Sequence, residues 1–148
     1  EWYVVGPVKN AELKQFLEMP YVTHIPYSER KKLADILRSS DCYIHSQLND
    51  NCPNSVLEAI STGLPVVGFN SGAMRELLPF STDLLAPVND KIFQAYHEFK
   101  PGRLAEKLAL CMDHYAEYRQ RALAHAHWYD FEETGRQYLD VFKQVFHL

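Results

Sequence analysis

The chain has 148 residues and a mass of 17.2 kDa, the size of one domain with a substantial core. Its formal charge of −4 provides no basic surface for a nucleic acid, which we exclude as a partner. No apolar run reaches the roughly 20 residues that span a bilayer, and no signal-peptide pattern opens the chain, so we expect a cytoplasmic protein. The three cysteines lack the paired spacing of a disulfide framework or a zinc site.

The first half of the chain alternates strand-like and helical patterns. Strands are predicted at residues 2–6, 22–25, 42–45, 65–69 and 84–85, and helices at 10–18, from 28 onward, at 53–62 and at 72–78. The nearly unbroken apolar runs WYVV and PVVGF are typical of parallel strands covered on both faces. The predicted fold class is therefore α/β, a doubly wound, Rossmann-like parallel sheet.

The second half reads as a helical tail over residues 90–148. Its pattern predicts helices at 90–99, at 103 to about 123, and at 131–146, with no strand between them. We expect its aromatic residues to pack against the domain; they are Tyr115, Tyr118, Trp128, Tyr129, Phe131 and Tyr138. The chain begins with Glu1 rather than Met, directly before a strand that reads as buried. We therefore expect residues 1–148 to be a single domain that is a fragment of a longer protein.

The most informative stretch is NDNCPNSVLEAISTGLPVV, residues 49–67. Pro53 is favoured as the first residue of a helix, which makes Cys52 the N-cap. The backbone N–H groups of Asn54, Ser55 and Val56 then have no carbonyl four residues earlier, at the positive end of the helix dipole. Because this helix follows the strand at 42–45, its start is a candidate phosphate site beyond the carboxyl ends of the strands.

Glu58 lies about 7.5 Å beyond Pro53 along that helix, at 1.5 Å per residue. Because apolar residues surround it in the sequence, we expect its carboxylate to be shielded from water and satisfied by a partner. The two hydroxyls of a ribose would serve as that partner, while a diphosphate lies over the start of the helix. The alternative is that Glu58 pairs with a Lys or Arg, or faces solvent.

The block NDNCPNSVLEAISTGLPVVGFNSGAMREL resembles the carboxyl-terminal domain of retaining glycosyltransferases of family 4. That family carries two glutamates eight residues apart, then EA, G-x-PVV, a Gly-Gly turn and a further Glu. The flanking segments YVTHIPYSERKKLADILRSSDCYIHSQ and FEETGRQYLDVF are similar as well, so the resemblance covers nearly the whole chain. It implies the carboxyl-terminal, donor-binding half of a GT-B enzyme.

The resemblance also implies a role for each site residue. Asp50 is the catalytic candidate, which contacts the hydroxyls of the transferred sugar, and Glu58 holds the ribose of a nucleotide-diphosphate sugar. Glu76 is a structural carboxylate behind the site. The remaining donor-binding candidates are Ile25 and Tyr27 beside the base, Asn51, Cys52, Asn54, Ser55 and Val56 along the sugar and diphosphate, and Gly72 and Ala73 in the turn that closes the pocket.

Three positions depart from the family pattern. Asp50 stands where Glu is usual, and its reach is shorter by about 1.5 Å, a displacement comparable to one that costs about 100-fold in rate. Asn51 and Ala73 each replace a common Gly. If those positions need positive φ, Asn tolerates it and Ala does so poorly.

The resemblance places the acceptor domain and the Arg and Lys residues that grip the diphosphate upstream of this chain. A helix N-terminus, worth up to about 2 kcal/mol, does not replace that clamp, so we expect the 148 residues alone to be inactive. The acceptor is a saccharide, lipid or protein, and missing parts would supply any peripheral membrane contact. No D-x-D motif occurs, so we expect no metal and no cofactor besides the donor substrate. We expect His45 to be a satisfied core histidine.

The predicted function is donor binding in a retaining, metal-independent glycosyltransferase. Two alternatives stay open. One is a non-catalytic nucleotide-sugar-binding subunit, and the other is a nucleotide-sugar epimerase, which shares the two-domain architecture without needing the Asp50 and Glu58 pair.

Overall fold

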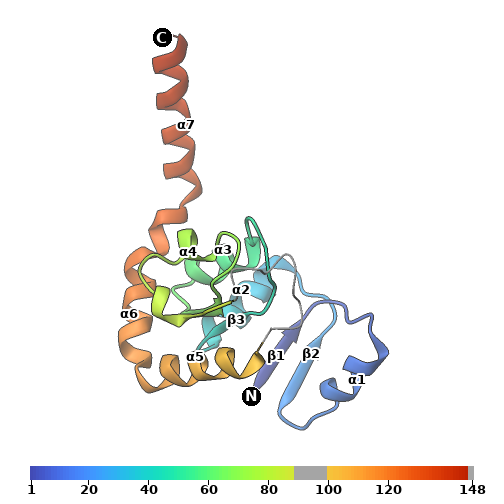
Figure 1. The fold of residues 1–148 in the computed structure, drawn as a ribbon. Coiled ribbons are helices and arrows are strands. Elements are labelled where there is room, and N and C mark those ends of the chain that lie inside the picture. The colour runs from blue at the N-terminus through green and yellow to red at the C-terminus, as the bar shows by residue number, and fades with distance from the viewer. Residues whose placement is uncertain (89–99, 147–148) are drawn as a thin grey trace. The chain divides into compact units, whose positions relative to one another are not determined.

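The computed structural model of the chain describes residues 1–88 and 100–146. It is a mixed α/β fold whose strands all pair in parallel, which confirms the predicted class (Figure 1). The elements of the first part are β1 (Trp2–Val5), α1 (Ala11–Leu17), β2 (Val22–Ile25), α2 (Arg30–Ser39), β3 (Tyr43–His45), α3 (Asn54–Ser61), β4 (Val66–Phe69), α4 (Met74–Leu77), the 3-10 helix η1 (Thr82–Leu84) and β5 (Leu85–Ala86). After residue 99 come α5 (Pro101–Asp113), α6 (Tyr115–His125), the 3-10 helix η3 (Ala126–Tyr129) and α7 (Phe131–Phe146).

The chain forms two compact units, Glu1–Ile36 and Leu37–Leu148. In the first unit, β1 and β2 pair in parallel with Trp2 opposite Val22, and α1 contacts β2. Asn10 caps α1, because its side-chain oxygen accepts a hydrogen bond from the Glu12 N–H at 2.8 Å. The prediction that β1 is buried is wrong: Trp2 and Tyr3 are each 46% exposed.

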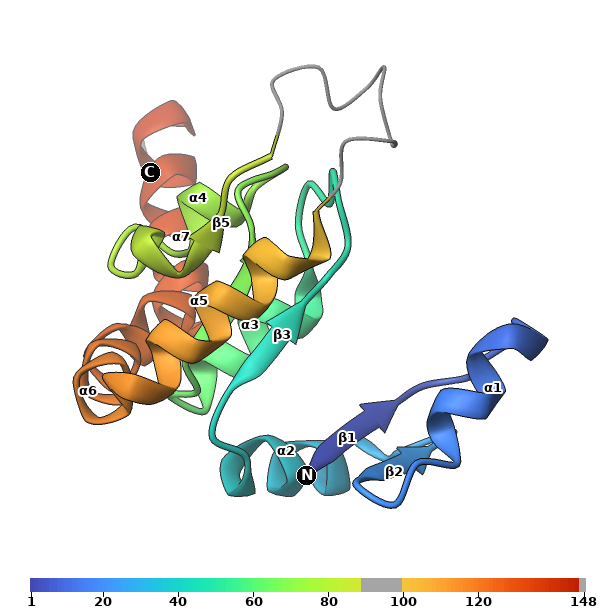
Figure 2. The same ribbon diagram turned by 60° about the horizontal axis from the view of Figure 1, so that its bottom comes forward.

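The second unit is built on a three-stranded parallel sheet in the order β3-β4-β5. The central strand β4 is buried throughout, as its continuous apolar sequence predicts. Helices α3 and α5 both contact β4, and Figure 2 shows the sheet lying between them. The sheet is therefore covered on both faces, which holds the ends of its strands in fixed positions.

Helix α3 ends where the sequence predicts. Gly63 follows it with φ of +71°, a conformation that L residues adopt poorly, and its N–H donates to the Ile60 carbonyl at 2.8 Å. Arg119 of α6 donates a hydrogen bond to the Gly63 carbonyl at 2.7 Å. A guanidinium at this end complements the negative pole of the helix.

The tail differs from its prediction. The helix expected from 103 to about 123 is two helices that meet at His114, whose φ of −119° and ψ of 30° interrupt the helical backbone. This change of direction lets Cys111 of α5 and Tyr118 of α6 join one core cluster with Val67 and Leu84. The helix predicted at 90–99 lies outside the described residues.

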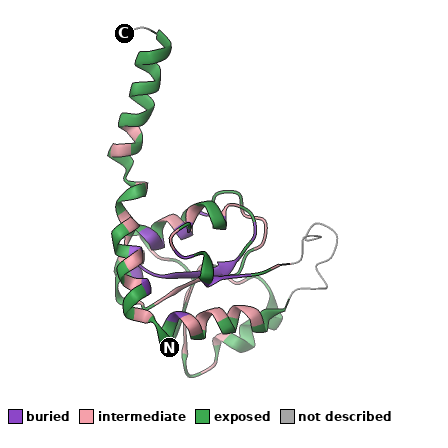
Figure 3. Cartoon of the chain, turned by 60° about the vertical axis from the view of Figure 1, so that its left-hand side comes forward, coloured by how far each residue is buried: buried purple, intermediate pink, exposed green. Residues whose placement is uncertain are grey.

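The predicted packing of the tail aromatics is correct for some residues and wrong for others. Tyr118 is 4% exposed, and the Tyr129 hydroxyl donates to the Leu77 carbonyl at 2.8 Å. Trp128 contacts the Phe80 ring edge-on at 6.3 Å between centroids, and its side chain remains 50% exposed. By contrast, no residue of α7 is buried (Figure 3). Two of its aromatic residues, Phe131 and Tyr138, are 90% and 64% exposed, so they do not pack against the domain.

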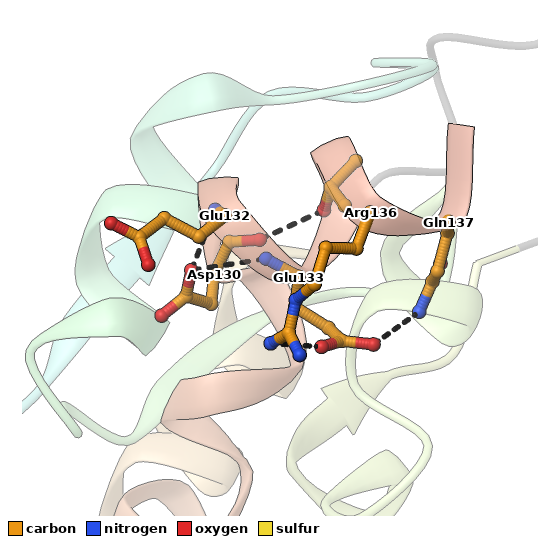
Figure 4. Close-up of polar contacts among 6 residues, drawn as sticks. Asp130, Glu132, Glu133, Arg136 and Gln137 are labelled. Carbon is orange, nitrogen blue, oxygen red and sulfur yellow. Dashed lines mark hydrogen bonds and ion pairs between the residues drawn. The ribbon is translucent and has the colours of Figure 1, made fainter. Parts of the chain in front are cut away.

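Local contacts define the start of α7. Asp130 accepts hydrogen bonds at one side-chain oxygen from the N–H groups of Glu132 and Glu133, at 2.7 and 3.3 Å. Figure 4 shows these bonds together with the Arg136–Glu133 ion pair one turn later, at 2.6 Å. Helix α7 is thus capped by its own sequence, as an N-terminal Asp predicts.

Candidate functional site

The candidate site lies beyond the carboxyl ends of β3 and β4. These neighbouring parallel strands pair with His45 opposite Gly68, so the loops that follow them leave the same edge of the sheet. Hydrogen bonds join the two loops: the Asn49 N–H donates to Ser71 Oγ at 2.8 Å, and Ser71 Oγ donates to Asn49 Oδ1 at 3.1 Å. The loops therefore form one connected structure.

Gly72 lets the backbones of the two loops approach closely. Its φ is +57°, and a Cβ atom at this position would lie 2.2 Å from the carbonyl oxygen of Asp50. The next N–H, that of Ala73, donates to the same Asp50 oxygen at 3.0 Å. Positive φ and lack of space both require glycine at position 72.

Neither Ala73 nor Asn51 has positive φ, so replacing glycine at these two positions causes no backbone strain. Ala73 has φ of −80°, which any L residue adopts, and among the described non-glycine residues only Asn49 has positive φ, at 57°. The position with positive φ in this loop is therefore Asn49, two residues before Asn51. Asparagine is one of the few side chains that tolerate it.

Both oxygens of the Asp50 side chain face protein groups. Oδ1 accepts a hydrogen bond from the Cys52 N–H at 3.1 Å, an arrangement typical of a turn that begins with aspartate. Oδ2 lies 4.0 Å from Nε2 of His45. The Asp50 side chain remains 23% exposed, so it is held in place and still open to a ligand.

His45 is buried, as predicted, but the prediction that it is satisfied is wrong. The side chain is 5% exposed, and among the described residues Nε2 has no hydrogen-bond partner. Burial lowers the pKa of His45 below its usual 6.5, and the negative charge of Asp50 opposes this shift in part. The ring is thus neutral at pH 7.

The start of α3 is one residue later than predicted. Pro53 is the N-cap, with φ of −69° and ψ of 101°, and Asn54 is the first helical residue. The proline ring fixes φ but leaves ψ free, and the turn at Asp50 keeps the chain extended through Pro53. The Val56 N–H donates to the Pro53 carbonyl at 3.0 Å. Within the described chain, the free N–H groups at this helix start are those of Asn54 and Ser55.

The expectation that Glu58 is shielded from water is wrong. It is exposed, whereas Val56, Ala59 and Ile60 are completely buried. At 100° per residue, Glu58 lies on the face of α3 opposite those three, together with Asn54 and Ser61. Its apolar sequence neighbours thus belong to another face of the helix. In the described chain its carboxylate has no ion-pair partner, and it lies on the same face as the free N–H of Asn54.

The remaining predicted residues are distributed as follows. Asn51 and Cys52 are exposed and precede α3, and Glu76 is exposed on α4. Ile25, at the end of β2, and Tyr27, which is 79% exposed, belong to the unit Glu1–Ile36. The second unit therefore brings together the loop at 49–56, Glu58 and the Gly72–Ala73 turn.

Sequence reasoning missed the linking residues Asn49 and Ser71 and the unpaired state of His45. The signal for Asn49 was the pair Asn-Asp in the loop that follows a strand, which favours a turn with positive φ. Among the described residues no three His, Cys, Asp or Glu side chains form a group that could hold a metal ion. No helix in the described ranges is long and apolar enough to cross a membrane.

Comparison with known proteins shows the family to which the chain belongs. The family model described as "Glycosyl transferases group 1" matches residues 1–98. A GDP-mannose-dependent alpha-mannosyltransferase of Mycobacterium tuberculosis (strain CDC 1551 / Oshkosh) is 38% identical over 89 residues, which is 59% of this chain and 23% of the relative. The chain thus spans about a quarter of that protein's length. No solved structure gives a significant match. With two thirds of its length covered by the family model, the chain belongs to the group 1 glycosyltransferases.

Proposed function

We propose that this chain is the donor-binding domain of a retaining, metal-independent glycosyltransferase of family 4 with the GT-B fold. It takes its sugar from a nucleotide-diphosphate sugar. One observation carries the proposal: the open start of α3 stands at the carboxyl end of β3, directly after a tethered Asp50. Two free N–H groups, on Asn54 and Ser55, suit a diphosphate there.

The carboxylates on either side fit the remainder of such a donor. Glu58 lies four residues after Asn54, roughly 6 Å along the axis at 1.5 Å per residue, the reach from a diphosphate to its ribose. Its oxygens are exposed and have no ion-pair partner among the described residues, so they can accept hydrogen bonds from two ribose hydroxyls. Asp50 Oδ2, on the other side of the helix start, is available to hydroxyls of the sugar. Exposure of Glu58 supports this role, since a buried carboxylate could not reach a ligand.

GDP-mannose is the first donor to test, because the matching relative is GDP-mannose-dependent. In the proposed reaction the bond between the anomeric carbon and the diphosphate oxygen breaks, and a bond to the acceptor oxygen forms on the same face. The acceptor proton passes to the leaving diphosphate. No metal ion or further cofactor takes part in the proposal, and the acceptor and its domain lie elsewhere. Cytoplasmic location and inactivity of the isolated chain stay predictions.

Calorimetric titration of the 148-residue chain with GDP-mannose, a UDP-sugar and an ADP-sugar tests the proposal. We expect saturable binding of one of them, reduced at least tenfold by Glu58→Ala, because hydrogen bonds to a charged acceptor contribute about 1.5–3 kcal/mol. Glu106→Ala is the matched control, since Glu106 is an exposed helical glutamate on α5. Absence of binding to all three donors, or equal losses in both variants, would contradict the donor-site assignment.

A further inference from the structure

The imidazole of His45 is a buried polar group that the proposed donor site does not use. It points from the last residue of β3 toward the loop that carries Asp50. Most buried polar atoms in proteins have a hydrogen-bond partner, because leaving one unpaired costs about 1–3 kcal/mol. Among the described residues Nε2 of His45 lacks such a partner, so a nearby acceptor that moved into hydrogen-bond distance would satisfy it.

Asp50 Oδ2 is positioned to supply that contact. The distance of 4.0 Å exceeds a hydrogen bond by about 1 Å, which a small rotation of the carboxylate removes. The backbone of Asp50 is held, because its carbonyl oxygen accepts from the Ala73 N–H. Rotation about the side-chain bonds brings Oδ2 to His45 without moving the loop, and it also shifts Oδ1 relative to the Cys52 N–H from which it accepts.

We propose that His45 is a positioning residue for Asp50: when the donor sugar binds, the Nε2–H of His45 donates to Oδ2 and fixes the carboxylate toward the sugar hydroxyls. This inference rests on the proposed function, and it concerns a residue that acts through Asp50 rather than on the substrate. His45 lies behind Asp50, since its Nε2 is inaccessible to solvent. A contact from behind fixes the orientation of the carboxylate, and that orientation determines which hydroxyls Asp50 reaches.

The protonation states suit this contact. Burial keeps His45 neutral, so its ring carries one N–H, and the tautomer with the proton on Nε2 is the one that can donate to Asp50. A neutral donor and a charged acceptor form a strong hydrogen bond without burying a second charge. Its loss should weaken sugar binding by roughly tenfold, the effect of losing one such bond.

Titration of the chain with GDP-mannose and with GDP separates sugar recognition from nucleotide recognition. We expect His45→Phe to lower the affinity for GDP-mannose about tenfold and to leave the affinity for GDP within twofold of wild type. His45→Gln, which retains an amide donor, should recover most of the loss. His127→Gln, at an exposed histidine, is the control. In the Asp50→Asn background, His45→Phe should have little further effect, because the charged partner is gone.

A second measurement needs no ligand. Histidine titration by NMR should show a lower pKa for His45 in Asp50→Asn than in the wild-type chain, because the nearby negative charge favours the protonated ring. An unchanged pKa would overturn the proposed contact, and so would equal GDP-mannose affinities of wild type and His45→Phe, while donor binding itself would stand. Failure of the wild-type chain to bind any donor would overturn the proposed function, and the role of His45 with it.

Discussion

Gly72→Ala is the substitution whose effect the structure determines most closely. The new Cβ would lie 2.2 Å from the Asp50 oxygen, whereas real contacts of this kind are essentially never shorter than 3.0 Å. Position 72 or the Asp50 backbone must therefore move by about 0.8 Å. Positive φ costs an L residue about 1–2 kcal/mol. Loss of the Ala73-to-Asp50 hydrogen bond adds about 1 kcal/mol, so we expect a loss of roughly 2–3 kcal/mol in the free energy of unfolding.

Urea denaturation and donor titration of the same protein measure both consequences. For a chain of this length the loss corresponds to a fall of roughly 5–10 °C in Tm. Displacement of Asp50 by nearly 1 Å should lower GDP-mannose affinity at least tenfold. Gly102→Ala is the control, because Gly102 has no positive φ and no atom within 4 Å of a Cβ, so its substitution should not lower stability. Equal stabilities of Gly72→Ala and Gly102→Ala would refute the close approach, and wild-type affinity in Gly72→Ala would refute the place of Asp50 in the donor site.

Three further predictions concern the second unit. Glu58→Ala should leave the free energy of unfolding within about 0.5 kcal/mol of wild type in urea denaturation, because the side chain is exposed; a larger loss would mean that it supports the fold. A thiol reagent should label exposed Cys52 first and buried Cys111 only on unfolding, as mass spectrometry of timed samples would show; early labelling of Cys111 would contradict the core. Burial and a hydrogen bond to Asp83 raise the pKa of Tyr118 from 10.0 to about 12. Because the folded state keeps the proton longer, the contribution of Tyr118 to stability should be full below pH 10 and fall by about 1.4 kcal/mol per pH unit from 10 to 12. Tyr118→Phe should remove that part of the fall in denaturation curves recorded at each pH, whereas Tyr129, whose pKa is also raised by burial, keeps its own part.

The order of elements and the main site loop could be predicted from sequence, because their signals are local. Alternation of strand and helix patterns placed β3, α3 and β4 within two residues, and Gly63 indicated the end of α3. The break at His114 could not be predicted in this way. It depends on Cys111 and Tyr118 reaching one core cluster, which is a tertiary effect.

Glu58 was expected to be shielded from water, but it is exposed. Its neighbours in sequence are apolar, but burial follows the face of a helix, and Glu58 is separated from the buried face by about half a turn. The proximity of His45 to Asp50 could not be predicted from the local sequence either, since it depends on the path of the loop after β3. What the local pattern does determine is that Glu58 stays on the same helix face as the free N–H of Asn54.

Amide chemical-shift mapping of the isotope-labelled chain with the donor that binds in the calorimetric titration tests the central claim most directly. The account predicts saturable shifts that are largest at the N–H groups of Asn54 and Ser55 and extend to Asp50, Glu58 and Gly72. Saturable shifts that leave Asn54 and Ser55 unmoved, or no shifts at all, would contradict the placement of the donor diphosphate at the start of α3.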